Sequence, residues 1–251
     1  MERWSGRLAL VTGAGSGIGA ALTRRLVKEG MRVVGVDLNV EKVQALGEEL
    51  KGQPGLVIPL KCDITKDDQV LHMFQRIAQK YGGVDVCVNN VGIMHNLTLM
   101  NGTPEEWRRM MDINVIALCL CTREAAKSML ERGVDDGHII HINSVAGHQV
   151  ANFPSMHFYT ASKYAVTALT EGMRQELRQT NTNIRISSIS PGVVRTEIRD
   201  TWLDTEATNK FYHEYPSLKP EDIVSSVMHA LAAPPHVQIH DVMVRNTRQQ
   251  Y

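Results

Sequence analysis

The stretch "RLALVTGAGSGIGAA", residues 7–21, decides the fold that this sequence predicts. A short apolar run leads into a loop that contains Gly13, Gly17 and Gly19, and an apolar helical pattern follows at once. Glycine lets the backbone approach a ligand closely, and a helix start offers unpaired N–H groups with a partial positive charge. This order favours a pyrophosphate site, although a plain strand-to-helix turn is the alternative.

The same alternation of short β-branched runs and longer helical patterns continues through the chain. Further strands are expected at 32–37, 56–62, 84–90, 137–143, 184–190 and 237–244, and helices at 17–29, 40–51, 66–80, 104–131, 157–179 and 220–232. Strands that are apolar on both faces and separated by helices imply a parallel sheet covered on both sides. We predict an α/β fold: one doubly wound domain over residues 1–251, with seven parallel strands flanked by helices on both faces.

Composition excludes several classes of function. Lys plus Arg and Asp plus Glu both total 27 in 251 residues, so net charge gives no reason to expect nucleic-acid binding. No apolar run is long enough for a membrane span, and the N-terminus does not read as a signal peptide. The cysteines lack metal-ligand spacing and lie in apolar runs, which indicates reduced thiols. We therefore expect a cytoplasmic protein without a bound metal; the four cysteines are Cys62, Cys87, Cys119 and Cys121.

The second strand ends in Asp37, 18 residues after Gly19. A carboxylate there can accept hydrogen bonds from both hydroxyls of an adenosine ribose, and it repels a 2′-phosphate. Neither Ser16 nor Leu38 supplies the cation that an NADP site would use. The sequence therefore favours NAD and leaves NADP possible; an Asp that only caps the strand end or the next helix is the alternative.

Tyr159 and Lys163 lie one helical turn apart in "FYTASKYAV", residues 158–166. Residues i and i+4 of a helix are neighbours, so the ammonium could tune the phenol, but the spacing also arises by chance. Tyr215 and Lys219 repeat the spacing in "YPSLK" between two prolines, where a helix is not expected. Context therefore favours the first pair.

Other polar residues follow the expected strands. Ser144 comes after the fifth strand, and Asn89, Asn90 and Gly92 stand at the end of the fourth. In an open parallel sheet, ligands bind outside the carboxyl ends of the strands. We expect these side chains to converge where a dinucleotide would lie.

These motifs together resemble the short-chain dehydrogenase/reductase family. The resemblance rests on "TGAGSGIG" (12–19), "NNVG" (89–92), "YTASK" (159–163) and "SPGVVRT" (190–196), and it runs from about residue 5 to the C-terminus. Within the family, "MERW", "CTREA", "VDDGHII" and "LKPED" resemble the animal group that includes insect farnesol dehydrogenases and vertebrate member-11 dehydrogenase/reductases. The resemblance implies a Rossmann-type fold and an NAD(P) cofactor.

The resemblance assigns four catalytic positions: Asn114, Ser144, Tyr159 and Lys163. A phenol with a pKa near 10 is a poor base at neutral pH, and a nearby cation favours its ionised form. Tyr159 would exchange the substrate's proton, while Lys163 lowers its pKa and holds the nicotinamide ribose. Ser144 would steady the reacting oxygen, and Asn114 would hold a water that links Lys163 to solvent.

The glycine loop, Asp37 and the family resemblance together define the expected cofactor contacts. They are Gly13, Ser16, Gly17, Ile18, Gly19, Asp37, Leu38, Asp63, Ile64, Asn90, Gly92, Tyr159, Lys163, Pro191, Gly192, Val194 and Thr196. Asp63 would meet the adenine amino group, although a helix cap explains it equally well. Val91 replaces the usual alanine of this motif.

Two segments, residues 145–156 and 195–215, should shape the substrate site. The expected apolar walls are Met94, Val150, Phe153, Trp202, Phe211 and Tyr212. His95 and His148 are candidate second acids, although no spacing supports either. An apolar site with one reacting oxygen suits an isoprenoid alcohol such as farnesol, a retinol-like alcohol, or a 17β- or 3β-hydroxysteroid.

We therefore expect an NAD(P)-dependent alcohol dehydrogenase or carbonyl reductase that acts on a small apolar alcohol or carbonyl. A non-catalytic dinucleotide sensor is a remote alternative, because a sensor needs the glycine loop but not a proton relay. A serine hydrolase is remoter still, because no G-x-S-x-G motif occurs. The resemblance also implies a homodimer or homotetramer through helices 104–131 and 157–179.

Overall fold

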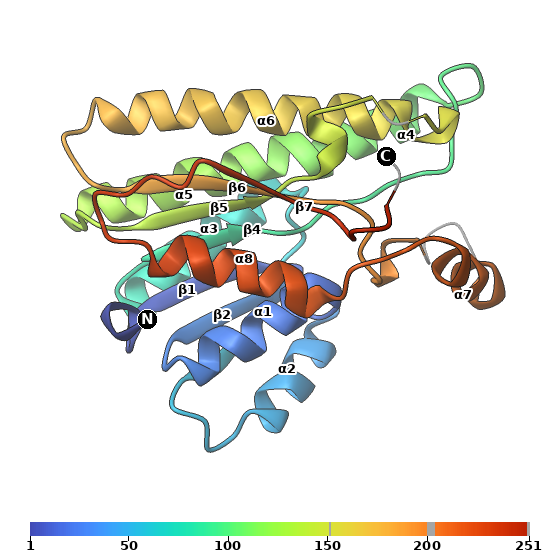
Figure 1. Ribbon diagram of the computed structural model, residues 1–251. Helices are drawn as coiled ribbons and strands as arrows, with labels where there is room; N and C mark the ends of the chain where they lie inside the picture. Colours follow the sequence, from blue (N-terminus) through green and yellow to red (C-terminus); the bar gives the residue numbers. More distant parts are fainter. Residues whose placement is uncertain (151, 200–203, 250–251) are drawn as a thin grey trace.

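The computed structural model describes residues 1–150, 152–199 and 204–249, and it contains a seven-stranded parallel sheet (Figure 1). The strand order is β3-β2-β1-β4-β5-β6-β7. The strands are β1 (Leu8–Thr12), β2 (Arg32–Asp37), β3 (Leu56–Lys61), β4 (Val86–Asn89), β5 (His138–Ile142), β6 (Arg185–Pro191) and β7 (Asp241–Val244). This confirms the predicted fold class.

Strands are added on opposite sides of β1 by the two halves of the chain: β2 and β3 on one side, and β4 to β7 on the other. Leu10 pairs with Val34 of β2 on one side and with Cys87 of β4 on the other, so β1 lies between strands from the two halves of the sequence. Outside the carboxyl ends of two such strands an open sheet leaves a crevice for ligands. The glycine loop follows β1 and the "NNVG" segment ends β4, so both reach this point.

The helices cover both faces of the sheet. They are α1 (Gly17–Lys28), α2 (Val40–Glu49), α3 (Asp67–Tyr81), α4 (Pro104–Met111), α5 (Ala117–Glu131), α6 (His157–Arg178), α7 (Thr205–Glu214) and α8 (Pro220–Ala232). Short 3-10 turns are η1 (Glu2–Trp4), η3 (Val145–Gly147), η4 (Pro154–Met156) and η5 (Glu197–Arg199), and a π-helical turn is η2 (Asp112–Ile116). In the described part of the chain, no helix is long and apolar enough to cross a membrane.

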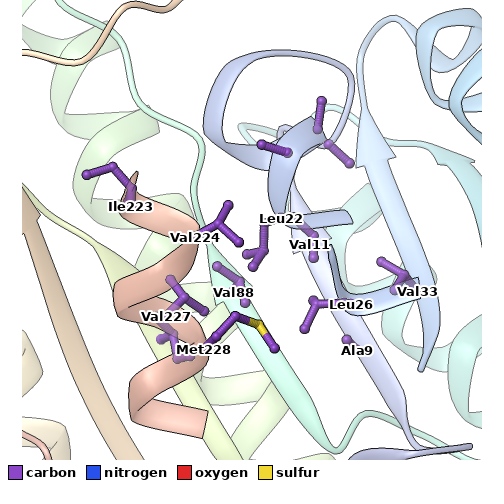
Figure 2. Close-up of a cluster of buried hydrophobic side chains, with 14 of the residues drawn as sticks. Ala9, Val11, Leu22, Leu26, Val33, Val88, Ile223, Val224, Val227 and Met228 are labelled. Atoms are coloured by element: carbon purple, nitrogen blue, oxygen red, sulfur yellow. The ribbon is translucent and has the colours of Figure 1, made fainter. Parts of the chain in front are cut away.

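Successive residues of β1 point to opposite faces, as the period of a strand requires. Ala9 and Val11 face a cluster in which Leu22 and Leu26 of α1 pack near Val224 of α8 (Figure 2). Leu8 and Leu10 face a second cluster, shared with buried residues of α3 and α5. Burial of both faces explains why the strand sequences are apolar throughout.

Two helical details differ from the sequence prediction. The expected helix 104–131 is divided by η2, where no proline or glycine signals a change, so the sequence did not predict it. Helix α7 was not predicted at all, although Asp204 caps it by accepting a hydrogen bond from the Ala207 N–H. An N-cap aspartate is a recognisable signal, but the segment has no clear apolar period to strengthen it.

The structure also bears on the last predicted strand and on the second tyrosine–lysine pair. Strand β7 covers only the second half of the expected 237–244. Tyr215 lies just beyond α7 with extended backbone, and Lys219 is the N-cap of α8, so this tyrosine–lysine pair is not helical. That prediction is confirmed.

We expect Leu26→Ala to lower the free energy of unfolding by about 2–5 kcal/mol, because Leu26 of α1 is fully buried in the cluster that contains Ala9 and Val11 of β1. The matched control is Leu71→Ala on α3, where the side chain is 43% exposed and the expected cost is below about 1 kcal/mol. Urea unfolding followed by circular dichroism measures both. Equal costs would contradict the described core.

Candidate active site

A cavity of about 640 Å³ opens at the carboxyl edge of the sheet. Its walls come from the glycine loop, the segments after β4, β5 and β6, the start of α6, and α7. Twelve of the expected cofactor residues line it: Gly13, Ser16, Gly17, Ile18, Asn90, Gly92, Tyr159, Lys163, Pro191, Gly192, Val194 and Thr196. The structure therefore brings the two ends of the expected site into one cavity.

The glycine loop is built for close backbone approach. Gly13 and Gly17 have φ of 66° and 48°, which side-chain-bearing residues rarely adopt. Gly19 lies under the loop, and a Cβ there would stand 2.0 Å from the Gly13 carbonyl oxygen. Asn90 holds the loop by donating from Nδ2 to the Thr12 and Gly13 carbonyls, at 2.9 and 3.3 Å.

The start of α1 fits an anionic ligand. Its N-cap, Ser16, makes no side-chain capping hydrogen bond. First-turn N–H groups have no acceptor within their own helix, and the helix dipole adds partial positive charge there. A pyrophosphate suits these donors, so the loop fits a dinucleotide on its own geometry.

Asp37 stands beside the glycine loop at the end of β2. One carboxylate oxygen accepts from the Gly15 N–H and the other from the Asn39 N–H, both at 2.9 Å. Helix α2 is capped by Asn39, which accepts from Lys42, so Asp37 is not the helix cap. Its carboxylate is thus held in place next to the loop, where a ribose could share it.

Asp63 is held in a turn of its own. Its Oδ1 accepts from the backbone and the hydroxyl of Thr65, and these hydrogen bonds lower the pKa of Asp63. The N-cap of α3 is Lys66, so Asp63 is not a helix cap either. Ile64 packs against the second core cluster. Five of the expected cofactor residues do not line the cavity: Gly19, Asp37, Leu38, Asp63 and Ile64.

Three of the four expected catalytic side chains meet in the cavity wall. Tyr159 and Lys163 are buried one turn apart on α6, and Ser144 follows β5 as the N-cap of η3. The Ser144 hydroxyl accepts from the Ala146 N–H at 3.1 Å, and it lies near enough to the Tyr159 phenol to lower the pKa of that group. A substrate oxygen placed between the two would touch both hydroxyls at once.

Asn114 lies behind the wall, in the middle of η2. Its Oδ1 accepts from the Ile93 N–H at 2.8 Å, and its Nδ2 donates to the Ile93 carbonyl and the Ser162 hydroxyl. Ser162 in turn donates to the Tyr159 carbonyl. Asn114 thus ties the segment after β4 to α6 and fixes the helix that carries the tyrosine.

Burial sets the pKa values of the pair on α6. It raises the pKa of Tyr159 to about 12, against the interaction with Ser144 and the charge of Arg199, which both lower it. It lowers the pKa of Lys163 to about 8. The Lys163 ammonium donates to the Ile142 carbonyl at 3.0 Å and lies 5.7 Å from the Tyr159 ring centroid. In the protein alone the pKa of Tyr159 is thus raised, opposite to the expected direction, because burial outweighs the nearby charges.

The expected substrate residues divide into two groups. Met94, Phe153 and Phe211 line the cavity, as does His95. Tyr212 instead directs its hydroxyl to the Val194 and Thr196 carbonyls. Val150 is exposed, His148 is bonded to Ser190 and Asp241, and Trp202 lies outside the described residues.

Among the residues that the sequence analysis did not single out, Arg199 and Gln249 also line the cavity, and Arg199 lies in the segment 195–215 that was expected to shape the substrate site. Arg199 ends η5, and Gln249 lies against Gly192 with its Oε1 accepting from the Val193 N–H at 3.1 Å. No local motif marks either one, because each reaches the cavity through the folding of a distant segment. Within residues 1–150, 152–199 and 204–249, no group of three His, Cys, Asp or Glu side chains could hold a metal ion.

Comparison with known proteins agrees with this geometry. A family model described as short chain dehydrogenase matches residues 7–207, and the chain belongs to this oxidoreductase family. It is 51% identical to "Dehydrogenase/reductase SDR family member 11" of Gallus gallus, over 99% of both chains. It is 45% identical to "Farnesol dehydrogenase" of Aedes aegypti, over the full length of both. The predicted resemblance is confirmed.

A solved structure is similar as well. A serine dehydrogenase complexed with NADP+ superposes with a TM-score of 0.86 at 29% identity, over 94% of both chains. A protein of the same fold thus binds a nicotinamide dinucleotide.

We expect Gly19→Ala to destabilise the protein by about 1–3 kcal/mol, because the new methyl group would overlap the Gly13 carbonyl and the loop would have to shift. Gly172→Ala on α6 is the matched control, because nothing lies within 4 Å of its Cβ and alanine favours a helix. Thermal unfolding compares the two. A Gly19→Ala protein as stable as the control would refute the described loop packing.

Proposed function

We propose that this protein is an NAD(P)-dependent alcohol dehydrogenase or carbonyl reductase that interconverts an apolar alcohol and its carbonyl. One observation carries the proposal: the hydroxyls of Tyr159 and Ser144 line one cavity together with the glycine loop. A site that binds a dinucleotide but performs no chemistry does not need this proton-exchanging pair, which disfavours the sensor hypothesis.

Tyr159 is the group that exchanges the substrate's proton. The bound nicotinamide would supply or accept the hydride at the substrate carbon. In oxidation the Tyr159 oxygen takes the hydroxyl proton, and in reduction it returns a proton to the forming alkoxide. Ser144 donates a hydrogen bond to the same substrate oxygen and stabilises its developing charge.

Lys163 supports this proton exchange. Its pKa of about 8 allows the ammonium to lose and regain a proton close to neutral pH. The ammonium is held by the Ile142 carbonyl, and a Cβ on Gly92 would lie 3.5 Å from Asn114 Oδ1 and 3.7 Å from Lys163 Nζ, so Gly92 lies beside both groups. We propose that a water near Asn114 links Lys163 to solvent, and that Lys163 also holds the nicotinamide ribose.

We propose NAD as the preferred cofactor, with NADP as the alternative. The fixed Asp37 carboxylate beside the glycine loop supports this choice, because a 2′-phosphate would be repelled there. The exposed neighbour Leu38 offers no charge to compensate. The similar serine dehydrogenase was solved with NADP+, which keeps the alternative open to test.

We propose an isoprenoid alcohol such as farnesol as the substrate, with a hydroxysteroid as the alternative. The relative named farnesol dehydrogenase and the apolar lining from Met94, Phe153 and Phe211 support it. A homodimer or homotetramer is also proposed; exposed apolar side chains on the helical faces, among them Ile116, Tyr164 and Leu169, support it.

Tyr159→Phe should lower kcat by at least about 100-fold, because the only group removed is the hydroxyl that exchanges the proton. Dinucleotide affinity, measured by the fluorescence of bound NADH or NADPH, should stay nearly unchanged. Tyr164→Phe, which alters an exposed tyrosine of the same helix, is the control and should keep full turnover. Comparable activity in both variants would remove Tyr159 from the mechanism.

Asp37→Ala should narrow the preference for NAD over NADP in kcat/KM by roughly tenfold or more, because it removes charged hydrogen bonds to the ribose. Glu41→Ala changes an exposed acid in the first turn of α2 and should leave the ratio unaltered. A wild-type protein with far higher kcat/KM for NADP would overturn the assignment of Asp37.

A further inference from the structure

The carboxylate of Glu197 lies against the start of α1, where the pyrophosphate of the proposed cofactor would bind. A Cβ on Gly17, the first residue of α1, would stand 3.3 Å from Glu197 Oε2 and 3.1 Å from Thr196 Cγ2. All three residues line the cavity. The segment that follows β6 therefore places an acidic group at the end of the cavity that is suited to an anion.

The start of α1 attracts a negative charge in the unliganded protein. Its N-cap, Ser16, makes no side-chain capping hydrogen bond. The N–H groups of a first helical turn lack acceptors within the helix, and their partial positive charge stabilises a nearby carboxylate. Within the described part of the chain, no hydrogen bond or ion pair holds the Glu197 carboxylate elsewhere. Glu197 therefore stands where a phosphate group would be favoured.

The backbone that carries Glu197 is anchored on both sides. The Thr196 N–H donates to the Tyr212 hydroxyl at 3.2 Å, and this hydroxyl lies 2.9 Å from the Thr196 carbonyl oxygen. On the other side, Ile198 packs against the buried cluster that contains Tyr159. The Glu197 side chain itself is exposed. Rotation of this side chain into solvent can thus clear the start of α1 while η5 stays in place.

We propose that Glu197 sets the affinity for the cofactor by occupying the start of α1 until the pyrophosphate displaces its carboxylate. The inference rests on the proposed dinucleotide site and adds a residue that weakens binding there. Repulsion between two like charges grows as their separation falls, so the carboxylate and the pyrophosphate do not share the helix start. The measured affinity therefore includes the cost of moving Glu197 away.

Other charged groups near the cavity are distinguished from Glu197 by their positions. Asp37 accepts from the Gly15 and Asn39 N–H groups, which fixes its carboxylate at the end of β2. Glu214 lines the same cavity, but it is an exposed residue at the last turn of α7. Neutralising Glu214 therefore removes an equal charge from the same cavity without changing the contact at Gly17.

The test uses two probes that differ in the pyrophosphate. ADP-ribose contains the pyrophosphate and lacks the nicotinamide, whereas adenosine lacks both. Glu197→Gln removes the charge and keeps the size of the side chain, and Glu214→Gln is the matched control. Calorimetric titration measures the Kd of ADP-ribose, and ligand-detected NMR measures that of adenosine.

The Kd of ADP-ribose should fall about 3- to 10-fold in Glu197→Gln, because the competing carboxylate is gone. The Kd of adenosine should stay the same, and Glu214→Gln should change the Kd of ADP-ribose by less than about twofold. An unchanged or higher Kd of ADP-ribose in Glu197→Gln would overturn the inference. An equal gain in Glu214→Gln would also overturn it, because only the net charge of the cavity would then matter.

Ionic strength separates charge competition from a structural effect of the substitution. Raising the salt from about 0.1 M to about 1 M shortens the reach of electrostatic interactions from about 10 Å to about 3 Å. The ratio of the wild-type Kd to the Glu197→Gln Kd for ADP-ribose should therefore fall towards one. A ratio that is independent of salt would contradict the inference.

These titrations need no turnover. If ADP-ribose binds but no alcohol or carbonyl is converted, the proposed enzymatic function fails, while the titrations still decide the role of Glu197. If ADP-ribose binds neither the wild-type protein nor Glu197→Gln, the dinucleotide site and the inference fail together.

Discussion

The tight packing of the glycine loop between β1 and β4 is the constraint on which the rest of the site depends. Gly19 must lie so close to the Gly13 carbonyl that a single methyl group would overlap it. Asn90, at the end of β4, clamps the same loop through the Thr12 and Gly13 carbonyls. The Asn90 side chain therefore joins β1 and β4, the two central strands from which the sheet is extended in opposite directions. It also fixes the loop before α1, where a phosphate would be bound.

The side chains proposed to be catalytic, Tyr159 and Lys163, are buried, and burial acts against their ionised forms. Without a cofactor, Tyr159 keeps its proton and the pKa of Lys163 falls to about 8. A positively charged nicotinamide beside them would favour tyrosinate, so the site becomes reactive when the dinucleotide is bound. We therefore expect proton exchange to depend on cofactor binding. Asn114 ties α6 to the segment after β4 through its hydrogen bonds to the Ile93 carbonyl and the Ser162 hydroxyl.

The sequence predicted the strands, their parallel arrangement and the residues at the carboxyl edge of the sheet. These features depend on the local alternation of apolar runs and helical patterns, and on backbone conformations that only glycine adopts readily. Ser144 and Asn90 could be placed at this edge before the fold was known, whereas the roles expected of Tyr159, Ser144 and Asn90 came from the family resemblance. The π-turn at Asp112–Ile116 could not, since it leaves no mark in composition. Gln249 could not either, because it reaches the cavity only after distant segments have packed together, and Arg199 was covered only by the expectation that residues 195–215 shape the substrate site.

The cofactor end and the substrate end of the cavity therefore differ in how well they can be predicted from sequence. The cofactor end is specified by glycines and strand ends, whose geometry tolerates little change, so relatives at 45–51% identity are expected to share its chemistry. The substrate end is formed by η5, α7 and the segment before α6, which meet through side-chain contacts such as Arg199 on Phe211. A substitution there alters which oxygen or ring is recognised while the hydroxyl pair stays in place. A relative's substrate is therefore weaker evidence than its reaction, and we expect the ring contacts among Phe153, Phe211 and Tyr215 to influence which substrate is accepted.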